Sequence, residues 1–226
     1  ANFVIAIQST DRNKLASLMP QSKIIVVGLA PPSQPAPRQR ESRSNIIRLS
    51  FIGSAMSPNV AAAKRLICNI FQPLREKLGF QVELHIYGEV CDQLGSIQHL
   101  DGVVLNGRAL SVSDVFSATD IFVNPVLTGG GLKIKNVEAL SYGVVLITST
   151  IGAEGIENGA GTAFILLDKD EEFVAAILTL IENPKSRWDF QNSAWKFASE
   201  NFTEEIVYSE IDAIWMNNSS DLRTTF

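Results

Sequence analysis

Short apolar runs alternate with stretches of helical periodicity along most of this chain. A short apolar run that ends at a glycine or another turn residue is typical of a strand buried on both faces. Strands that alternate with helices predict a parallel, doubly wound α/β sheet, which is the fold class we expect. The predicted strands are residues 2–8, 23–29, 46–52, 82–87, 103–106, 121–124, 144–148 and 163–167.

The helix expected after the third apolar run has signals at both ends. Ser57 is a candidate N-cap, Pro58 suits the first turn, and Gly79 follows the last apolar position. Pro73 interrupts the helical pattern, so we expect a kink or a break there. Further helices are predicted at residues 11–18, 112–118, 133–142, 171–182, 186–199 and 203–216.

The C-terminal part differs from the rest because its predicted helices follow one another with no strand between them. Thr203 is a candidate N-cap of the last helix, and Glu204 and Glu205 suit the positive end of its dipole. This helix carries an apolar stripe that needs a partner surface. The stripe consists of Ile206, Val207, Ile211, Ile214 and Trp215.

Composition divides the chain into four segments. Residues 1–30 are expected to be the remnant of a first domain, because one short βαβ unit is too small to bury a core alone. Residues 31–44 are rich in proline and arginine and lack apolar periodicity, so they are expected to form a linker. Residues 45–185 form the main sheet domain, and residues 186–226 form C-terminal helices and a tail. Because the chain opens inside an apolar run, we expect it to be cut from a longer protein.

Composition and charge narrow the classes of function. With 46% hydrophobic and 19% charged residues among 226, the chain has the composition of an ordinary globular protein. Its net charge of −5 argues against broad nucleic-acid binding, which needs a basic surface. We expect no membrane span and no signal peptide. Cys68 and Cys91 lack metal-ligand spacing, so we expect a reduced, cytoplasmic setting, with membrane contact at most peripheral, at the inner face.

The candidate chemistry lies in the stretch 124–140, between a predicted strand and a predicted helix. Open α/β sheets bind ligands at the carboxyl ends of their strands. Gly129, Gly130 and Gly131 let the backbone approach a ligand closely. The helix that follows directs unpaired N–H groups and a partial positive charge to the same place. The stretch therefore predicts a site for an anion.

Charged residues in the following helix sharpen this prediction. Lys133 and Lys135 stand at its first turn, where a cation opposes the helix dipole by about 0.3–1 kcal/mol at an exposed site. A bound anion reverses the sign of that effect, so the pair indicates a phosphate or diphosphate site. Glu138, one turn further on, is suited to accept hydrogen bonds from ribose hydroxyls. Taken singly, the glycines could be only a loop and Lys135–Glu138 an ordinary surface pair, but their combination favours a functional site.

The stretch 128–140 resembles the donor-site signature of glycosyltransferases with the GT-B architecture, in particular of glycosyltransferase family 4. The similarity covers about residues 45–216, and residues 1–30 resemble the last βαβ unit of the acceptor domain of such enzymes. The other matching motifs are FIGS at 51–54 with PN at 58–59, DVFSATDIFVNP at 114–125, ALSYGVVLIT at 139–148 and GAEG at 152–155.

The resemblance implies that this segment binds a nucleoside-diphosphate sugar, the donor of the transferred sugar. The glycine loop and the amides after it, aided by the two lysines, would hold the diphosphate, and the glutamate would hold the ribose. The backbone of Arg108 would meet the base, and the loop after the first strand of the main sheet would face the cleft. The implied binding residues are Gly53, Ser54, Arg108, Gly129, Gly130, Gly131, Leu132, Lys133, Lys135 and Glu138.

Two features depart from the family pattern. Many relatives carry two glutamates eight positions apart, and Gly130 stands where the first would be. The Arg/Lys pair often found after the first strand has no obvious counterpart, since Lys64 and Arg65 are expected on a solvated helix face. His85 is expected on a strand face and His99 in a polar loop, so we assign no catalytic residue.

We therefore expect the nucleotide-sugar-binding half of a glycosyltransferase, hexosyltransferase-like and retaining by family resemblance, that acts in carbohydrate biosynthesis. The expected partners are the donor, an acceptor glycan, lipid or small molecule, and a missing N-terminal domain without which the segment transfers no sugar. No metal and no cofactor are expected. The alternatives are a nucleotide-sugar epimerase or phosphorylase of the same fold, and a non-catalytic module that binds a partner through the tail helices.

Overall fold

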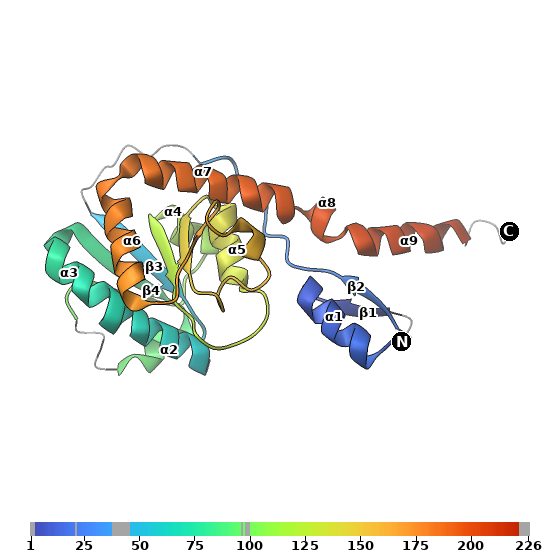
Figure 1. Cartoon of the computed structure of the whole chain (residues 1–226), viewed down its shortest axis with the longest axis horizontal. Helices are drawn as coiled ribbons and strands as arrows, with labels where there is room; N and C mark the ends of the chain where they lie inside the picture. Colours follow the sequence, from blue (N-terminus) through green and yellow to red (C-terminus); the bar gives the residue numbers. More distant parts are fainter. Residues whose placement is uncertain (1–2, 21, 38–45, 96, 98–99, 222–226) are drawn as a thin grey trace.

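The computed structural model describes residues 3–20, 22–37, 46–95, 97 and 100–221, and in this part the chain forms two separate parallel sheets. The smaller sheet pairs β1 (Phe3–Ala6) with β2 (Lys23–Val26), and α1 (Ser9–Leu18) connects them. We call this βαβ segment the N-terminal unit. It lies beside the last helix, α9 (Ser209–Asp221), in Figure 1.

The larger sheet has six parallel strands in the order β5-β4-β3-β6-β7-β8. The chain starts in the middle of this sheet, builds outward to one edge, and then returns to build toward the other edge. The strand order therefore reverses between β3 and β6, which are hydrogen-bonded neighbours. The predicted doubly wound α/β sheet is confirmed. Its strands are β3 (Ile47–Ile52), β4 (Val82–Tyr87), β5 (Val103–Gly107), β6 (Ile121–Asn124), β7 (Val145–Thr148) and β8 (Ile165–Leu166).

Helices cover both faces of this sheet, which is why β6 and β7 are buried at every residue. All four residues of β6 are buried, and they alternate between the two faces. Ile121 and Val123 pack with α2 (Ser57–Arg65), α3 (Gln72–Leu78) and α6 (Asp170–Glu182). Phe122 packs on the opposite face with α4 (Val112–Ser117), α5 (Ile134–Ser141) and α7 (Pro184–Asn201). The three layers are visible in Figure 1.

The helix that contains Pro73 continues through the proline instead of breaking. A π-helical segment, η1 (Leu66–Phe71), joins α2 to α3, and the N–H of Gln72 bonds to the carbonyl of Ile67. Proline has no N–H and its ring crowds the preceding turn, so a locally wider turn accommodates it. Gly79, with φ +56, ends α3 as expected. The predicted N-cap is wrong by one residue, because Met56 occupies that position and Ser57 is already helical.

The tail contains two helices where one was expected at residues 203–216. After the predicted cap Thr203, α8 (Glu204–Val207) ends at Tyr208, and α9 (Ser209–Asp221) follows. The reason is tertiary: Glu210 forms an ion pair with Arg12 of α1 at 3.0 Å and accepts a hydrogen bond from the N–H of Val26. The break thus directs α9 onto the N-terminal unit.

The proline-rich segment has no helix or strand over residues 31–37, and the indole N–H of Trp195 donates to the carbonyl of Gln34. Arg38, Arg40 and Arg43 of the predicted linker lie outside the described residues, as does His99.

Candidate functional site

The glycine loop, residues 125–133 between β6 and α5, stands at the point where the strand order of the sheet reverses. In open α/β sheets this point is the ligand-binding crevice, outside the carboxyl ends of the strands. Gly129 has φ +111 and Gly131 has φ +80, backbone conformations that side chains disfavour. The predicted loop, strand end and helix start are therefore brought together at the end of the sheet where open α/β folds bind ligands.

The backbone amides of the glycine loop are unpaired. Among the described residues, no hydrogen bond engages the N–H groups of residues 129–135, and the first paired amides are those of Asn136 and Val137, both bonded to the carbonyl of Lys133. Gly129 and Gly130 are exposed. A row of unpaired N–H groups at a helix N-terminus carries a partial positive charge and suits an anion.

Lys133 braces this loop. It occupies the N-cap position of α5, and its Nζ donates to the carbonyl of Gly131 at 2.5 Å. Its Nζ also lies 3.4 Å from Oε2 of Glu154, and its side chain is only 12% exposed. The ammonium group is therefore held beside the row of amides and already faces one carboxylate.

Lys135 turns in the opposite direction, toward the first strand of the main sheet. Its Nζ donates to the carbonyl of Ile52 at 2.8 Å and to Oδ1 of Asn59 at 2.7 Å, and lies 4.3 Å from the centre of the Phe51 ring. Burial, and after it the nearby charge of Lys133, lowers the pKa of Lys135 to about 7. Lys135 therefore connects α5 to the end of β3.

The loop after β3 lies next to the start of α2, which approaches the glycine loop: a Cβ at Gly129 would lie 3.9 Å from Pro58. The N–H of Gly53 donates to the carbonyl of Tyr87, and a Cβ at Gly53 would lie 2.9 Å from the Phe51 ring and 3.0 Å from Cβ of Asn59. Asn59 also donates through Nδ2 to Oγ of Ser54 at 3.0 Å. Asn59 thus joins Lys135 to the Gly53–Ser54 loop.

A buried amide network supports the floor of the site. Asn136, fully buried in α5, accepts from Nδ2 of Asn124 at 2.9 Å and donates to Oγ1 of Thr148 and to the carbonyl of Gly152. These bonds join β6, α5, β7 and the loop after β7. Asn136 was not predicted as a site residue, although its position beside Val137, on the apolar face of a predicted helix, was an available signal.

Arg65 also supports the site, against expectation. Its side chain is 11% exposed rather than solvated, and it pairs with Asp170 at 2.5 Å. It donates to the carbonyl of Pro125, the first residue of the glycine loop, at 2.8 Å. Arg65 is shielded from solvent because α6 and the glycine loop both pack against this side of α2. Lys64, in contrast, is exposed as expected.

The remaining implied residues lie around the crevice. Glu138 is half-buried on α5, one turn after Lys135, and burial raises its pKa. Leu132 packs against the core face under α5 and α7. Arg108 follows β5 and forms an exposed ion pair with Glu89 at 2.7 Å.

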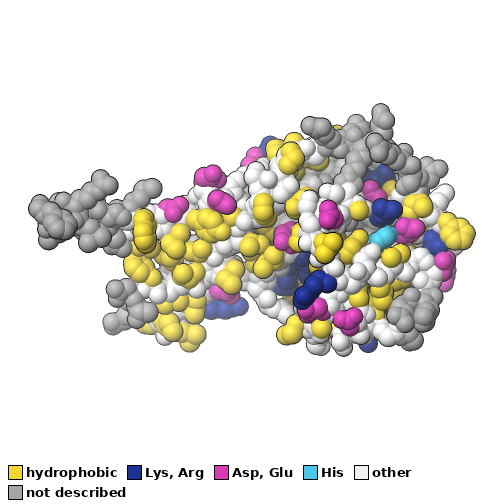
Figure 2. Space-filling view, turned by 180° about the vertical axis from the view of Figure 1, so that it is seen from behind, with side chains coloured by type: hydrophobic (Ala, Val, Ile, Leu, Met, Phe, Trp, Pro, Cys, Tyr) yellow, Lys and Arg dark blue, Asp and Glu magenta, His cyan; other side chains and the backbone are white. Residues whose placement is uncertain are grey.

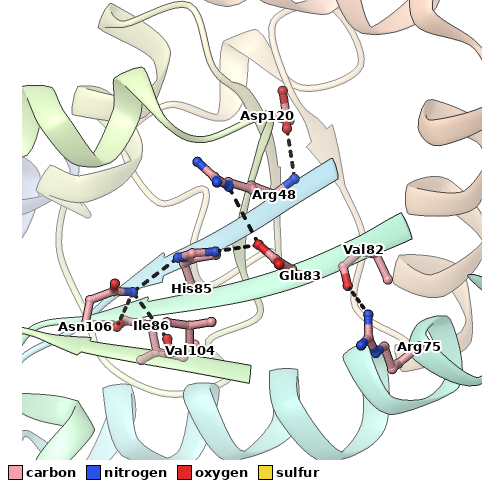
Figure 3. Close-up of polar contacts among 9 residues, drawn as sticks. All are labelled: Arg48, Arg75, Val82, Glu83, His85, Ile86, Val104, Asn106 and Asp120. Atoms are coloured by element: carbon pink, nitrogen blue, oxygen red, sulfur yellow. Dashed lines mark hydrogen bonds and ion pairs between the residues drawn. The ribbon is translucent and has the colours of Figure 1, made fainter. Parts of the chain in front are cut away.

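His85 has a structural environment. Its ring nitrogens lie 3.2 Å from Oε2 of Glu83 and 3.4 Å from Nδ2 of Asn106. Figure 3 shows both contacts as dashed lines. The same carboxylate lies 3.7 Å from Arg48. The expectation that this histidine is a strand-face residue is confirmed.

A cavity of about 450 Å³ separates the N-terminal unit from the main sheet domain. Its lining includes Gln8 at the carboxyl end of β1, and Leu132 and Gly155 from the main domain. Gln8 is 6% exposed, and neither its Nε2 nor its Oε1 has a hydrogen-bond partner among the described residues. The sequence analysis did not single out this glutamine.

The described residues contain neither a candidate metal site nor a candidate membrane helix. No group of three or more histidine, cysteine, aspartate or glutamate side chains is placed to hold a metal ion there. No helix in that part of the chain is long and apolar enough to cross a membrane.

Residues 47–183 match the family model described as glycosyl transferases group 1. This chain belongs to that family. Among curated proteins, it is 25% identical over 171 residues to an uncharacterized 44.6 kDa protein in the cps region of Klebsiella pneumoniae. It is 26% identical over 171 residues to an uncharacterized glycosyltransferase of Methanocaldococcus jannaschii. The alignments cover 71% and 72% of this chain but only 44% and 43% of those proteins, so the chain spans less than half of their length.

Solved structures share the fold of this family member. S. aureus TarM, crystallised with UDP among other ligands, superposes with a TM-score of 0.74 at 16% identity, over 96% of this chain and 43% of that one. The pneumococcal O-GlcNAc transferase GtfA, crystallised with UDP and GlcNAc, superposes with a TM-score of 0.72 at 15% identity, over 96% of this chain and 45% of that one. Anabaena HepE, crystallised with UDP and glucose, superposes with a TM-score of 0.71 at 15% identity, over 96% of this chain and 63% of that one. The resemblance to glycosyltransferases and the Rossmann-like fold that it implied are confirmed.

Proposed function

We propose that this chain is the donor-binding part of an enzyme that transfers a sugar from a nucleoside-diphosphate sugar to an acceptor hydroxyl. One observation carries the proposal: the unpaired amides of residues 129–135 stand at the switch point of the sheet, with Lys133 beside them. That arrangement is a preformed site for a diphosphate. Membership of the glycosyl transferases group 1 supports it.

The chemistry that this site favours follows from where charge develops. As the bond between the sugar C1 and the diphosphate oxygen breaks, the acceptor oxygen bonds to C1 and loses its proton, and the diphosphate leaves with added negative charge. Donors fixed in place before the reaction stabilise such charge without reorganising. The glycine-loop amides and Lys133 would supply them, with no metal ion and no cofactor needed for this step.

The other implied residues take supporting roles in the proposal. Glu138 would accept hydrogen bonds from the ribose, because it lies one turn from the amides on the same helix. Arg108 would meet the base through its backbone, because it follows the carboxyl end of β5. Gly53 and Ser54 would form the opposite wall, and Leu132 would contribute its N–H.

The acceptor would approach through the cavity between the N-terminal unit and the main domain. Gln8 and Gly155 line it from opposite sides, and Gln8 has an amide with no partner among the described residues, suited to a hydroxyl. Figure 2 shows hydrophobic side chains gathered over the end that holds the N-terminal unit and the tail. Phe3, Ile5 and Ile7 there are 37%, 57% and 59% exposed, which supports a further N-terminal domain against this surface.

The cellular setting belongs to the same proposal. Cys68 and Cys91 are unpaired thiols, which suits a reducing, cytoplasmic environment. Contact with a membrane at its inner face would be peripheral.

Calorimetric titration of this chain with uridine, guanosine and adenosine diphosphates tests the donor site. UDP is the first probe, because three similar structures were crystallised with it. We expect one diphosphate to bind at one site, and the corresponding nucleoside to bind more weakly. If no diphosphate binds, the donor-site assignment is wrong and a non-catalytic role is favoured. Product analysis of the full-length protein then separates sugar transfer from epimerisation or phosphorolysis.

A further inference from the structure

Lys135 is a largely buried lysine for which the described residues provide no carboxylate partner. Within the described part of the chain it forms no ion pair, while its Nζ makes two hydrogen bonds to neutral acceptors, the carbonyl of Ile52 and Oδ1 of Asn59. The Phe51 ring lies 4.3 Å from its Nζ. A buried charge is usually paired, because its desolvation is otherwise uncompensated. When Lys135 is protonated, a negative charge other than these neutral contacts must balance its ammonium group.

The two hydrogen bonds do not decide its protonation state. A neutral amine keeps two N–H donors and gains a lone pair, whereas an ammonium has three N–H donors. Either form can donate to both Ile52 and Asn59. The third proton is therefore the variable one, and its binding depends on the electrostatic surroundings.

Those surroundings disfavour the charged form while the crevice holds no anion. Burial and the charge of Lys133 lower the pKa of Lys135 to about 7. Among the described residues, the carboxylate that pairs with Lys133 is that of Glu154, at 3.4 Å. Glu138 is one turn away on α5, and burial raises its own pKa, so it favours its neutral form. The groups from β3 and α2 that face Lys135 are uncharged.

We propose that Lys135 is a positioning residue that takes up a proton when a nucleoside diphosphate binds, and that through Asn59 it sets the Gly53–Ser54 loop against the glycine loop. The inference rests on the proposed donor site. The proton comes from the solvent buffer and forms the third N–H bond with the lone pair of Nζ. The diphosphate supplies the negative charge that no carboxylate of the described residues provides to Lys135.

The coupling runs through a continuous set of contacts. Lys135 holds Oδ1 of Asn59 at 2.7 Å, and Nδ2 of the same amide holds Oγ of Ser54 at 3.0 Å. On the other side, a Cβ at Gly129 would lie 3.9 Å from Pro58, so the two walls of the crevice approach each other at the start of α2. Lys135 stands in the first turn of the helix whose N-terminal amides would face the anion, and its hydrogen bonds hold the opposite wall, so its charge is coupled to both.

Calorimetry of UDP binding in buffers of different ionisation enthalpy, at pH 7, measures the protons taken up. A lysine with a pKa of about 7 is about half neutral at that pH, so wild type should take up about half a proton more than Lys135→Met. Lys135→Arg, which stays charged, should match Lys135→Met, and the protons exchanged by UDP itself cancel in these comparisons. Lys64→Met, at an exposed position on α2, is the matched control and should behave as wild type.

A second variant keeps the test decisive if Lys135→Met does not fold. Asn59→Asp gives the lysine a carboxylate partner, so the proton should already be bound and the uptake should disappear, with weaker UDP affinity. Equal uptake in wild type and in the variants, with UDP bound by all of them, would overturn the role of Lys135 and leave the donor site standing. Absence of UDP binding to wild type would instead refute the donor site itself.

Discussion

Lys133 and Glu154 face each other at 3.4 Å beside the unpaired amides of the glycine loop. The lysine is 12% exposed and the glutamate 23% exposed, so the pair is shielded from water on most sides. A carboxylate near the expected diphosphate position competes with it for the same cation. This competition gives the two side chains opposite predicted effects on affinity.

Replacing Lys133 by alanine should weaken diphosphate binding more than nucleoside binding. The lost contact is a hydrogen bond between charged groups, worth about 1.5–3 kcal/mol, or about 10-fold to 100-fold in affinity. Titrations of UDP and uridine with wild type and Lys133→Ala measure the difference, and Lys64→Ala is the exposed control. Equal losses for both ligands would show that this lysine does not contact the phosphates.

The Glu154→Gln substitution should have the opposite effect. It removes the negative charge that opposes the ligand and leaves a side chain of the same shape. UDP affinity should rise by up to about fivefold, the equivalent of a partly exposed ion pair of about 1 kcal/mol. The same calorimetric titration measures it. A fall in affinity would mean that the pair orients Lys133 rather than competing for it.

The glycine loop offers a matched pair of substitutions. Gly131 has φ +80, whereas Gly130 has an ordinary backbone conformation, and a Cβ at either would meet no atom within 4 Å. Gly131→Ala should therefore cost about 1–2 kcal/mol of stability or displace the loop, with weaker UDP binding. Gly130→Ala should change the free energy of unfolding by less than about 0.5 kcal/mol. Urea denaturation and UDP titration of both variants test this, and equal effects would show that backbone strain is not the cause.

Lys135 should make stability depend on pH in the neutral to mildly alkaline range. Its pKa falls from 10.5 to about 7 on folding, so between these values the unfolded chain binds more protons than the folded one. The free energy of unfolding from this group therefore rises with pH through that window, by at most about 1.4 kcal/mol per pH unit. Below pH 7 the folded protein bears the full destabilisation caused by burying the charged Lys135.

Urea denaturation of wild type and Lys135→Met at pH 7 and pH 9 measures the contribution of Lys135 to the free energy of unfolding. Taking the difference between the two proteins cancels the contribution of other groups, including Cys91, whose pKa is raised by burial. The advantage of Lys135→Met over wild type should shrink as the pH rises. A constant difference would show that the buried lysine stays charged throughout.

Local patterns along the chain were sufficient for much of the fold and for the position of the glycine loop. β4 and β6 have the predicted bounds, because β4 alternates apolar with polar residues up to Gly88 and β6 is a short apolar run that ends before Pro125. The glycine loop between β6 and α5 was equally clear, since three glycines between a buried strand and a helix have few other local explanations. Such signals act over a few residues, so the sequence alone determined them.

Contacts between residues distant in the chain decided the features that local patterns did not predict. Arg65 is buried because Asp170 and the carbonyl of Pro125, which are distant in the chain, meet it there. The helix expected at residues 203–216 breaks at Tyr208 because Glu210 pairs with Arg12 in the N-terminal unit. The two lysines of one motif also diverge, Lys133 toward Glu154 and Lys135 toward β3. Their spacing in sequence determined only that both stand at the start of α5, whereas the parallel pairing of β3 with β6 decided which groups surround each ammonium.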